Sequence, residues 1–225
     1  MDSLRPVELS QTTPPAGPTN TISQVFFSND QGTLFTTVKG DPSQNKTGFL
    51  GAYRVSKKGS VQQYRVQSSP NGTAVLFGSS TIPKSNNLFV TDASFGGAIL
   101  YVDPKSDAAF VKGMGVVGGQ KATCWVAVSS ATGSAFVTDV GTNRLIEMSL
   151  NDASIKSILD LSSNGDPGLT DLKAAGQFVY ALSPGNGTTQ SAVTVVDAIA
   201  KKQLQHFVLG QLGVGRNAQG MAVML

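Results

Sequence analysis

The chain has 225 residues, of which 40% are hydrophobic and 14% are charged. This composition is typical of a globular protein and excludes an intrinsically disordered chain. The net charge is +3, and the 17 basic residues form no basic block, so nucleic acid is not an expected partner. The longest apolar runs, such as Ala98–Val102, are far shorter than the roughly 20 residues that span a bilayer, so membrane insertion is not expected.

Residues 1–20 are predicted to form an extended arm outside the folded domain. Residues 10–20 are rich in proline and threonine and show no hydrophobic periodicity. The start, Met1–Arg5, has no apolar stretch of the kind that a secretory signal carries. The localisation stays open: extracellular if a signal peptide precedes this start, and cytoplasmic otherwise.

A four-strand pattern begins at residue 21 and recurs three more times. Its most recognisable member is a strand with a phenylalanine, which recurs as Phe35, Phe89, Phe136 and Phe178. The strand that follows has its centre at residues 53, 101, 147 and 195, which gives spacings of 48, 46 and 48 residues. The expected strands, unit by unit, are Ile22–Ser28, Thr33–Val38, Phe49–Val55 and Val61–Val66; Thr73–Gly78, Asn87–Thr91, Ala98–Asp103 and Ala108–Lys112; Cys124–Ser129, Ser134–Thr138, Arg144–Met148 and Ile155–Leu159; and Leu169–Ala174, Gln177–Tyr180, Ala192–Asp197 and Gln203–Val208.

This repeat predicts an all-β protein with the fold of a β-propeller. Four strands at a period of about 47 residues match a propeller blade. A β-sandwich with regular turns is the alternative, but a sandwich has no reason to repeat one strand with the same successor. The predicted blades lie in a single domain, residues 21–225, at about 21–68, 72–116, 122–162 and 168–210.

A final strand, residues 217–225, is expected to be the inner strand of a fifth blade. About four blades and one extra strand do not complete a seven-bladed ring, so the chain is predicted to be a partial or truncated propeller. The apolar faces and the unpaired edge at its two ends would then be exposed to water, which favours association with another chain. The sequence therefore predicts self-association through open blade faces.

Three stretches carry a resemblance to a known family: Thr37–Pro42, Leu88–Ser94 and Phe136–Arg144. They resemble the fungal lactonase-like propellers called 3-carboxymuconate cyclases, in the seven-bladed 6-phosphogluconolactonase-like superfamily. The third stretch looks like that superfamily's strand ending in Asp-Leu-Gly-x-Asp-Arg, although Asn143 stands where an aspartate is usual. The resemblance implies an isomerase or lactonase that closes or opens a lactone on a small carboxylated substrate.

Blade symmetry predicts where this chemistry lies. The ends of the phenylalanine strands are expected on one face of the propeller, at the mouth of the central channel. Arg144 and Asp139 are the candidate catalytic residues, because a guanidinium binds a carboxylate bidentately and a carboxylate can transfer a proton. The candidate substrate-binding residues are Lys39, Asp41, Asp92, Ser183 and Arg216. For each aspartate the alternative is a turn former that caps backbone amides.

No cofactor is expected. Some related propellers hold a divalent cation in the channel, and Asp92, Asp139 and Asn143 are the hard oxygen ligands available here. The sequence contains no Cys/His cluster for zinc. The one cysteine, Cys124, is expected in the core, and the one histidine, His206, on an outermost strand far from the channel.

A second hypothesis is a secreted, non-catalytic propeller that serves as a binding or antigen-like module. Its motivation is the absence of a histidine for the centre of the channel and the presence of three glycosylation sequons. These lie at Asn45, Asn71 and Asn186, all in predicted surface turns.

Overall fold

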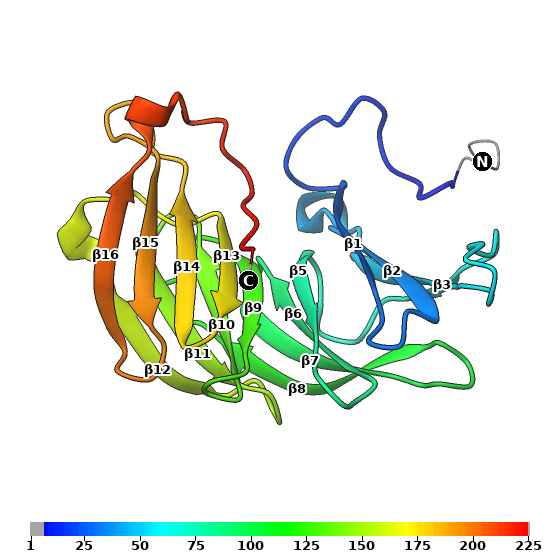
Figure 1. The fold of residues 1–225 in the computed structure, drawn as a ribbon. Coiled ribbons are helices and arrows are strands. Elements are labelled where there is room, and N and C mark those ends of the chain that lie inside the picture. The colour runs from blue at the N-terminus through cyan, green and yellow to red at the C-terminus, as the bar shows by residue number, and fades with distance from the viewer. Residues whose placement is uncertain (1–6, 225) are drawn as a thin grey trace.

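The structure is a computed structural model that describes residues 7–224. In that range sixteen strands form four antiparallel sheets, and each sheet contains four strands that are consecutive in the chain. The sheets stand side by side like the blades of a fan (Figure 1). The strands are β1 (Ile22–Phe27), β2 (Thr33–Val38), β3 (Phe49–Arg54) and β4 (Val66–Ser68) in blade 1; β5 (Leu76–Thr81), β6 (Asn87–Asp92), β7 (Gly96–Val102) and β8 (Ala109–Val116) in blade 2; β9 (Thr123–Ser129), β10 (Ser134–Asp139), β11 (Arg144–Ser149) and β12 (Ile155–Asp160) in blade 3; and β13 (Asp171–Ala175), β14 (Phe178–Ser183), β15 (Ala192–Asp197) and β16 (Lys202–Val208) in blade 4.

The prediction of four four-stranded blades is confirmed, and most strand bounds agree within two residues. The fourth strand of blade 1 is an exception. It was expected at Val61–Val66, but Val61 makes only an isolated bridge with Val55, and the strand β4 is the short segment Val66–Ser68. Besides the strands, the described residues contain three short 3-10 turns, none long and apolar enough to cross a membrane.

The phenylalanine repeat is out of register in blade 4. Phe35, Phe89 and Phe136 each occupy the third position of their strand and are buried. In β14 the third position is Tyr180, and Phe178 is the first residue of the strand. Because residues 178 and 180 lie on the same face of a pleated strand, the hydrophobic alternation hides this two-residue difference in the sequence.

The second and third strands of the two central blades are buried on both faces, which is why they contain nearly continuous runs of apolar residues. Leu88 of β6 packs in the cluster shared with blade 1, whereas its neighbour Phe89 packs in the cluster shared with blade 3. In β10, Val137 belongs to that same second cluster, and Phe136 belongs to the cluster shared with blade 4. Successive residues thus face different neighbouring blades.

The threonine that recurs near the end of the second strands links blade 1 to blade 2 and blade 2 to blade 3. Thr37 donates a hydrogen bond to the carbonyl oxygen of Phe77 in blade 2, at 2.9 Å. Thr91 donates to the carbonyl oxygen of Cys124 in blade 3, at 2.5 Å. Their acceptors lie on β5 and β9, the first strands of their sheets, which face the common centre of the fan (Figure 1). We call β1, β5, β9 and β13 the inner strands.

The described part of the predicted arm lies against blade 1. Residues 7–20 contain no helix or strand, and residues 1–6 are outside the described range. Leu9 is buried against Val38 and Phe49. Arg65 donates a hydrogen bond to the carbonyl oxygen of Glu8. The described part of the arm is therefore attached to the domain.

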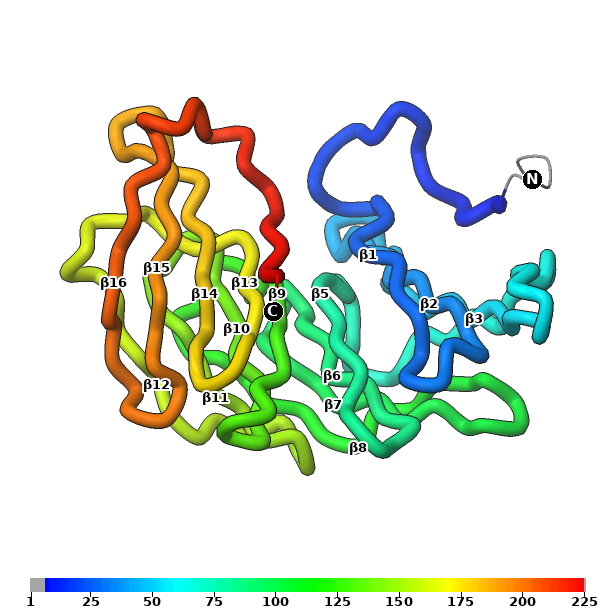
Figure 2. The backbone as a smooth tube through the Cα atoms, viewed as in Figure 1, coloured from blue at the N-terminus to red at the C-terminus, as the bar shows by residue number. Residues whose placement is uncertain are grey.

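The fifth inner strand expected at residues 217–225 is not formed, and residue 225 lies outside the described range. Residues 217–224 run back from the outer strand β16 to the inner strand β13 as an irregular segment (Figure 2). The amide of Met221 donates to the carboxylate of Asp171 at 2.8 Å. A side-chain acceptor holds the segment in place of a ladder of backbone hydrogen bonds, so no strand results.

Candidate functional site

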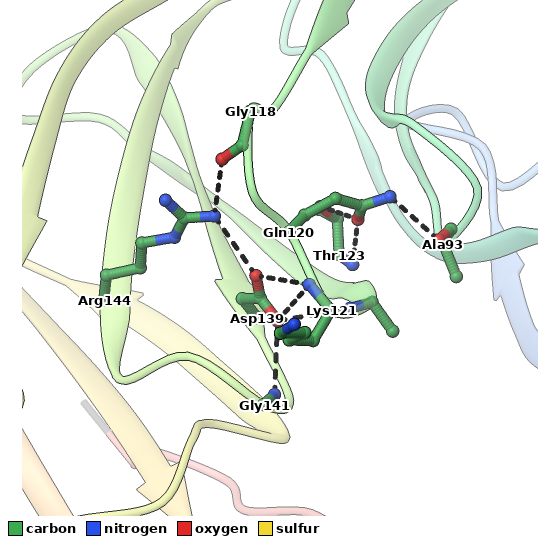
Figure 3. A network of polar contacts seen from close by, with 9 residues as sticks. Ala93, Gly118, Gln120, Lys121, Thr123, Asp139, Gly141 and Arg144 are labelled. Carbon is green, nitrogen blue, oxygen red and sulfur yellow. Dashed lines mark hydrogen bonds and ion pairs between the residues drawn. The ribbon is translucent and has the colours of Figure 1, made fainter.

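Asp139, a predicted catalytic residue, is a buried cap in the structure. It ends β10, and its carboxylate is fully buried. It accepts hydrogen bonds from the backbone amides of Lys121, Ala122 and Gly141 at 3.0 to 3.2 Å (Figure 3). These amides lie before the inner strand β9 and in the turn after β10. The carboxylate therefore fixes the start of the inner strand to the end of the second strand.

Asp92 holds the equivalent place in blade 2 and does the same. It is fully buried and accepts hydrogen bonds from the amides of Ala74 and Val75 at 2.7 to 3.1 Å. It also accepts from the amide and the hydroxyl of Ser94. The sequence predicted that this strand begins at Thr73, but β5 begins at Leu76. The cap explains the difference, because the amides of Ala74 and Val75 bind Asp92. Neither aspartate offers an exposed carboxylate to a substrate at the channel mouth. The geometry fits the alternative, in which each aspartate is a turn former that caps backbone amides.

Arg144, the other predicted catalytic residue, keeps a hydrogen-bond donor that is not used within residues 7–224. Its Nη2 donates to the carbonyl oxygen of Gly118 at 3.0 Å and lies 3.3 Å from Oδ2 of Asp139 (Figure 3). The side chain is 15% exposed. Its Nε is buried, and no residue in the range 7–224 accepts a hydrogen bond from it. Asp139 thus positions a guanidinium whose donors are only partly used.

The link between blades 2 and 3 contains a polar residue that the sequence did not suggest. Gln120 donates from Nε2 to the carbonyl oxygen of Ala93 at 3.0 Å. Its Oε1 accepts from the amide and the hydroxyl of Thr123 at 2.6 and 2.7 Å. Gln120 therefore ties the turn after β6 to the first residue of β9 (Figure 3). Nothing in the sequence distinguishes it from an ordinary turn residue.

The remaining predicted binding residues do not gather around Arg144. Asp41 caps a 3-10 turn by accepting from the amide and hydroxyl of Ser43. Ser183 is fully buried, and Arg216 is exposed in the C-terminal segment. Among the predicted residues in the described range, the only direct contact is that between Asp139 and Arg144.

The candidate cation ligands are also engaged elsewhere. Asn143 is buried, and its Nδ2 donates to the carbonyl oxygen of Leu161 and to Oδ1 of Asn164. Asp92 and Asp139 hold backbone amides of different blades. No group of three His, Cys, Asp or Glu side chains suited to a metal ion occurs between residues 7 and 224.

A row of cations and aromatic rings runs from the end of β2 across three inner strands. It contains Lys39, which directly follows β2, and Phe77, Trp125 and Lys173 on β5, β9 and β13, and we call these four residues the inner-strand row. The Nζ atom of Lys39 lies 4.4 Å from the centre of the Phe77 ring. The Phe77 and Trp125 rings meet edge to face, with their centres 6.2 Å apart. The Nζ atom of Lys173 lies 5.6 Å from the Trp125 ring. Blades 1 to 4 thus contribute one residue each.

The two lysines of the inner-strand row differ in their surroundings. Lys39 is only 9% exposed, and burial lowers its pKa. No carboxylate within residues 7–224 pairs with it. Lys173 is 37% exposed and lies 3.3 Å from Oδ1 of Asp171. Of these four residues, only Lys39 was predicted from the sequence as a substrate-binding residue. The signal that could have pointed to the row is an aromatic residue on each of two successive inner strands, Phe77 on β5 and Trp125 on β9.

Cys124 and His206 agree with their predicted locations. Cys124 is buried, and burial raises the pKa of its thiol to about 12, so it is no nucleophile. His206 lies on the outermost strand β16, as expected. Its side chain is only 21% exposed, however, because it lies against the buried Asp166, with Nε2 3.1 Å from Oδ2.

The three sequon asparagines, Asn45, Asn71 and Asn186, are all exposed in turns, so glycosylation stays a prediction that their geometry permits.

No protein-family model matches this sequence, and no curated protein does. Solved structures do match. The hydrazine synthase of Kuenenia stuttgartiensis superposes with a TM-score of 0.64 at 14% identity, over 85% of this chain and 50% of that chain. A nidogen/laminin complex gives 0.59 at 14% identity, over 86% and 66%. The WD40 domain of Neurospora crassa Pan2 gives 0.57 at 13% identity, over 84% and 50%.

These similarities define the fold as a β-propeller, here with four blades. The chain spans half the length of two of these three structures and 66% of the other. They include an enzyme and a protein complex, and at 13 to 14% identity they show the fold alone.

Proposed function

We propose that this propeller binds a small, flat, carboxylated or lactone molecule at the inner-strand row. The observation that carries the proposal is Lys39, a buried ammonium that faces an aromatic ring and has no carboxylate partner within residues 7–224. A buried charge without a counter-ion is costly, so a ligand carboxylate would stabilise it. Lys173 offers a second cation on the far side of Phe77 and Trp125.

The order of groups in the row suggests the shape of the ligand. A carboxylate at each end would meet an ammonium group, and a flat conjugated chain between them would lie against the face of one ring and the edge of the other, because Phe77 and Trp125 meet edge to face. A muconate has this arrangement: two carboxylates joined by a conjugated diene. A lactone that keeps a second carboxyl group offers one carboxylate and a flat ester group. This ligand class is the one that the resemblance to the lactonase-like propellers implies.

Lactonase- or cycloisomerase-type turnover is the finer part of the proposal. Arg144, held by Asp139, supplies a fork that suits a carboxylate or the oxygen of a ring being closed. The reaction also needs a proton donor or acceptor at the reacting carbon. Asp139 and Asp171 both accept hydrogen bonds from backbone amides; we assign this role to Asp171, because it also contacts Lys173 of the row. Asp139 is then a positioning residue.

A turnover assay with cis,cis-muconates and sugar lactones tests this chemistry. We expect Arg144→Lys to lower kcat/KM at least tenfold, because lysine keeps the charge and loses the fork. Asp171→Asn is expected to abolish turnover and to retain binding. Turnover that is absent in the unmodified chain, or unchanged in both variants, contradicts the catalytic assignment and leaves binding to be judged by calorimetry.

A second candidate is a non-catalytic binding module. The observation that favours it is the use of Asp92, Asp139 and His206 in structural contacts, which removes the obvious acid–base groups. In this case calorimetry shows saturable binding of a muconate or lactone that Lys173→Ala weakens, while no product forms. Detectable lactone turnover contradicts this candidate.

A further inference from the structure

A cleft of about 490 Å³ opens between blades 1 and 2, away from the inner-strand row. It is lined by the β1–β2, β5–β6 and β7–β8 turns. Strand β6 begins in this cleft with Asn87 and ends at the cap residue Asp92. The cleft and the caps therefore lie at opposite ends of the same strand, so the cleft is separate from the site around Arg144.

Two polar clasps fix the width of the cleft. On blade 1, Arg54 forms an ion pair of 2.6 Å with Asp107 of blade 2 and donates to the carbonyl oxygen of Pro104 at 3.0 Å. Asn29 donates from Nδ2 to the carbonyl oxygens of Ile82 and Ser85 at 2.9 and 3.2 Å. Because both clasps join one blade to the other, the cleft is formed before any ligand arrives.

The floor of the cleft is apolar, and its rim has unused hydrogen-bonding groups. Phe35, Leu88 and Val102 are buried beneath it. On the rim, several side chains make no hydrogen bond within residues 7–224: the amides of Asn86 and Asn87, the hydroxyls of Thr33 and Thr81, and the ammonium of Lys84. A floor of carbon atoms under several convergent polar groups is the usual composition of a small-molecule site.

We propose that this cleft binds a neutral, polyhydroxylated ligand, namely a sugar of one or two rings. The charged groups of the lining balance, because Asp30 and Asp107 offset Arg54 and Lys84. An anion or a cation would therefore meet a like charge. Each asparagine side chain both donates and accepts, as does each sugar hydroxyl, and the C–H face of a sugar ring fits the apolar floor. The volume lies within the range of about 300 to 1,000 Å³ that such sites have.

An NMR titration of the full chain with glucose, galactose, mannose, maltose and lactose tests this proposal. The probes are the side-chain NH₂ signals of Asn86 and Asn87 in the unmodified protein, which need no variant. We expect saturable shifts of these signals with at least one sugar, and no competition from a muconate. The absence of saturable shifts with all five sugars overturns the proposal. So do shifts produced by glutamate or phosphate and not by the sugars.

Variants locate the site. Asn87→Ala is expected to weaken sugar binding about tenfold, the effect of one lost hydrogen bond to a buried ligand group. The matched control is Asn151→Ala, because Asn151 is exposed in the β11–β12 turn of another blade, and it should leave the affinity unchanged. Equal affinities of both variants overturn the assignment to this cleft. Because this site is separate from the inner-strand row, its failure would leave the proposed function untouched.

Discussion

Asp92 and Asp139 occupy the same position in neighbouring blades, and each holds two backbone amides that precede the inner strand of its own sheet. A carboxylate that accepts several amide hydrogen bonds in a dry environment is a strong structural link. The link decides where the inner strand starts, and so where the inner-strand row lies. Asp92 and Asp139 therefore affect the inner-strand row only by positioning the strands that carry it.

Replacing the cap in blade 3 should therefore destabilise the whole domain. Asp139→Ala leaves the amides of Lys121, Ala122 and Gly141 without an acceptor. Hydrogen bonds to a charged group contribute about 1.5 to 3 kcal/mol each, so we expect the free energy of unfolding in urea to fall by at least about 3 kcal/mol. Asp160→Ala is the control, because Asp160 caps an exposed turn and its loss should matter far less. Equal stability of the two variants would show that Asp139 serves a ligand and not the cap.

Acid should weaken the packing of blade 3 against blade 4 through Glu147. This buried carboxylate lies 2.8 Å from Lys201 and 3.4 Å from Lys156, and it accepts from the hydroxyls of Ser134 and Ser157 at 2.7 Å. Burial alone raises its pKa, but the hydrogen bonds from Lys201 and the two serines outweigh this effect and lower it to about 2, from an ordinary 4.5. A depressed pKa contributes stability above pH 4.5 that is lost as the pH falls towards 2.

The loss between these two pH values should amount to roughly 3 kcal/mol in the free energy of unfolding. Urea unfolding at pH 6, 4.5, 3 and 2 measures it. Glu147→Gln should be less stable at pH 6 and should flatten the pH dependence. A variant with the same pH slope as the unmodified chain would show that other groups carry the effect.

The single thiol gives a direct test of how tightly the inner strands pack. Burial raises the pKa of Cys124 from 9.0 to about 12, so the thiolate fraction at pH 8 should be about a thousandfold below that of a free thiol. We expect maleimide labelling to be very slow in native buffer and fast in urea. Native labelling within tenfold of the rate in urea would mean that β9 opens readily or that the thiol is accessible.

The two end blades expose apolar side chains, so we predict that this chain self-associates. On β1, Val25 and Phe27 are 55% and 50% exposed; on β16, Leu204 and Phe207 are 45% and 50% exposed. These strands belong to the blades at the two ends of the fan (Figure 1). Size exclusion with light scattering should give a mass that rises with concentration.

The variant Val25→Ser/Phe27→Ser should lower this mass. Tyr64→Ser is the control, because Tyr64 is 88% exposed outside any strand. A sharp, concentration-independent monomer that melts cooperatively at high temperature would contradict the open-ring interpretation.

The strands could be predicted because each carries its own signal, an alternating or continuous apolar run between turn residues. The candidate site could not be predicted in the same way. A strand-end aspartate such as Asp139 looks the same in sequence whether it caps amides or faces a substrate. The contact of Lys39 with Phe77 joins residues of different blades, and so does that of Trp125 with Lys173. Such contacts depend on blade packing, which no local pattern encodes. The segment 217–224 reads like an inner strand in sequence, but the side chain of Asp171 binds it where a backbone ladder would be needed.

Trp125 allows the most direct test of the proposed function, because it is the only tryptophan and lies in the inner-strand row. The measurement is a fluorescence titration of the full chain with cis,cis-muconate, compared by dissociation constant. We expect a saturable change in Trp125 emission, with binding weakened about tenfold in Lys173→Ala. Binding should be unchanged in the control Lys58→Ala, because Lys58 is exposed in a turn of blade 1. No saturable change in the unmodified chain, or one dissociation constant shared by it and Lys173→Ala, would contradict the assignment of this row as the ligand site.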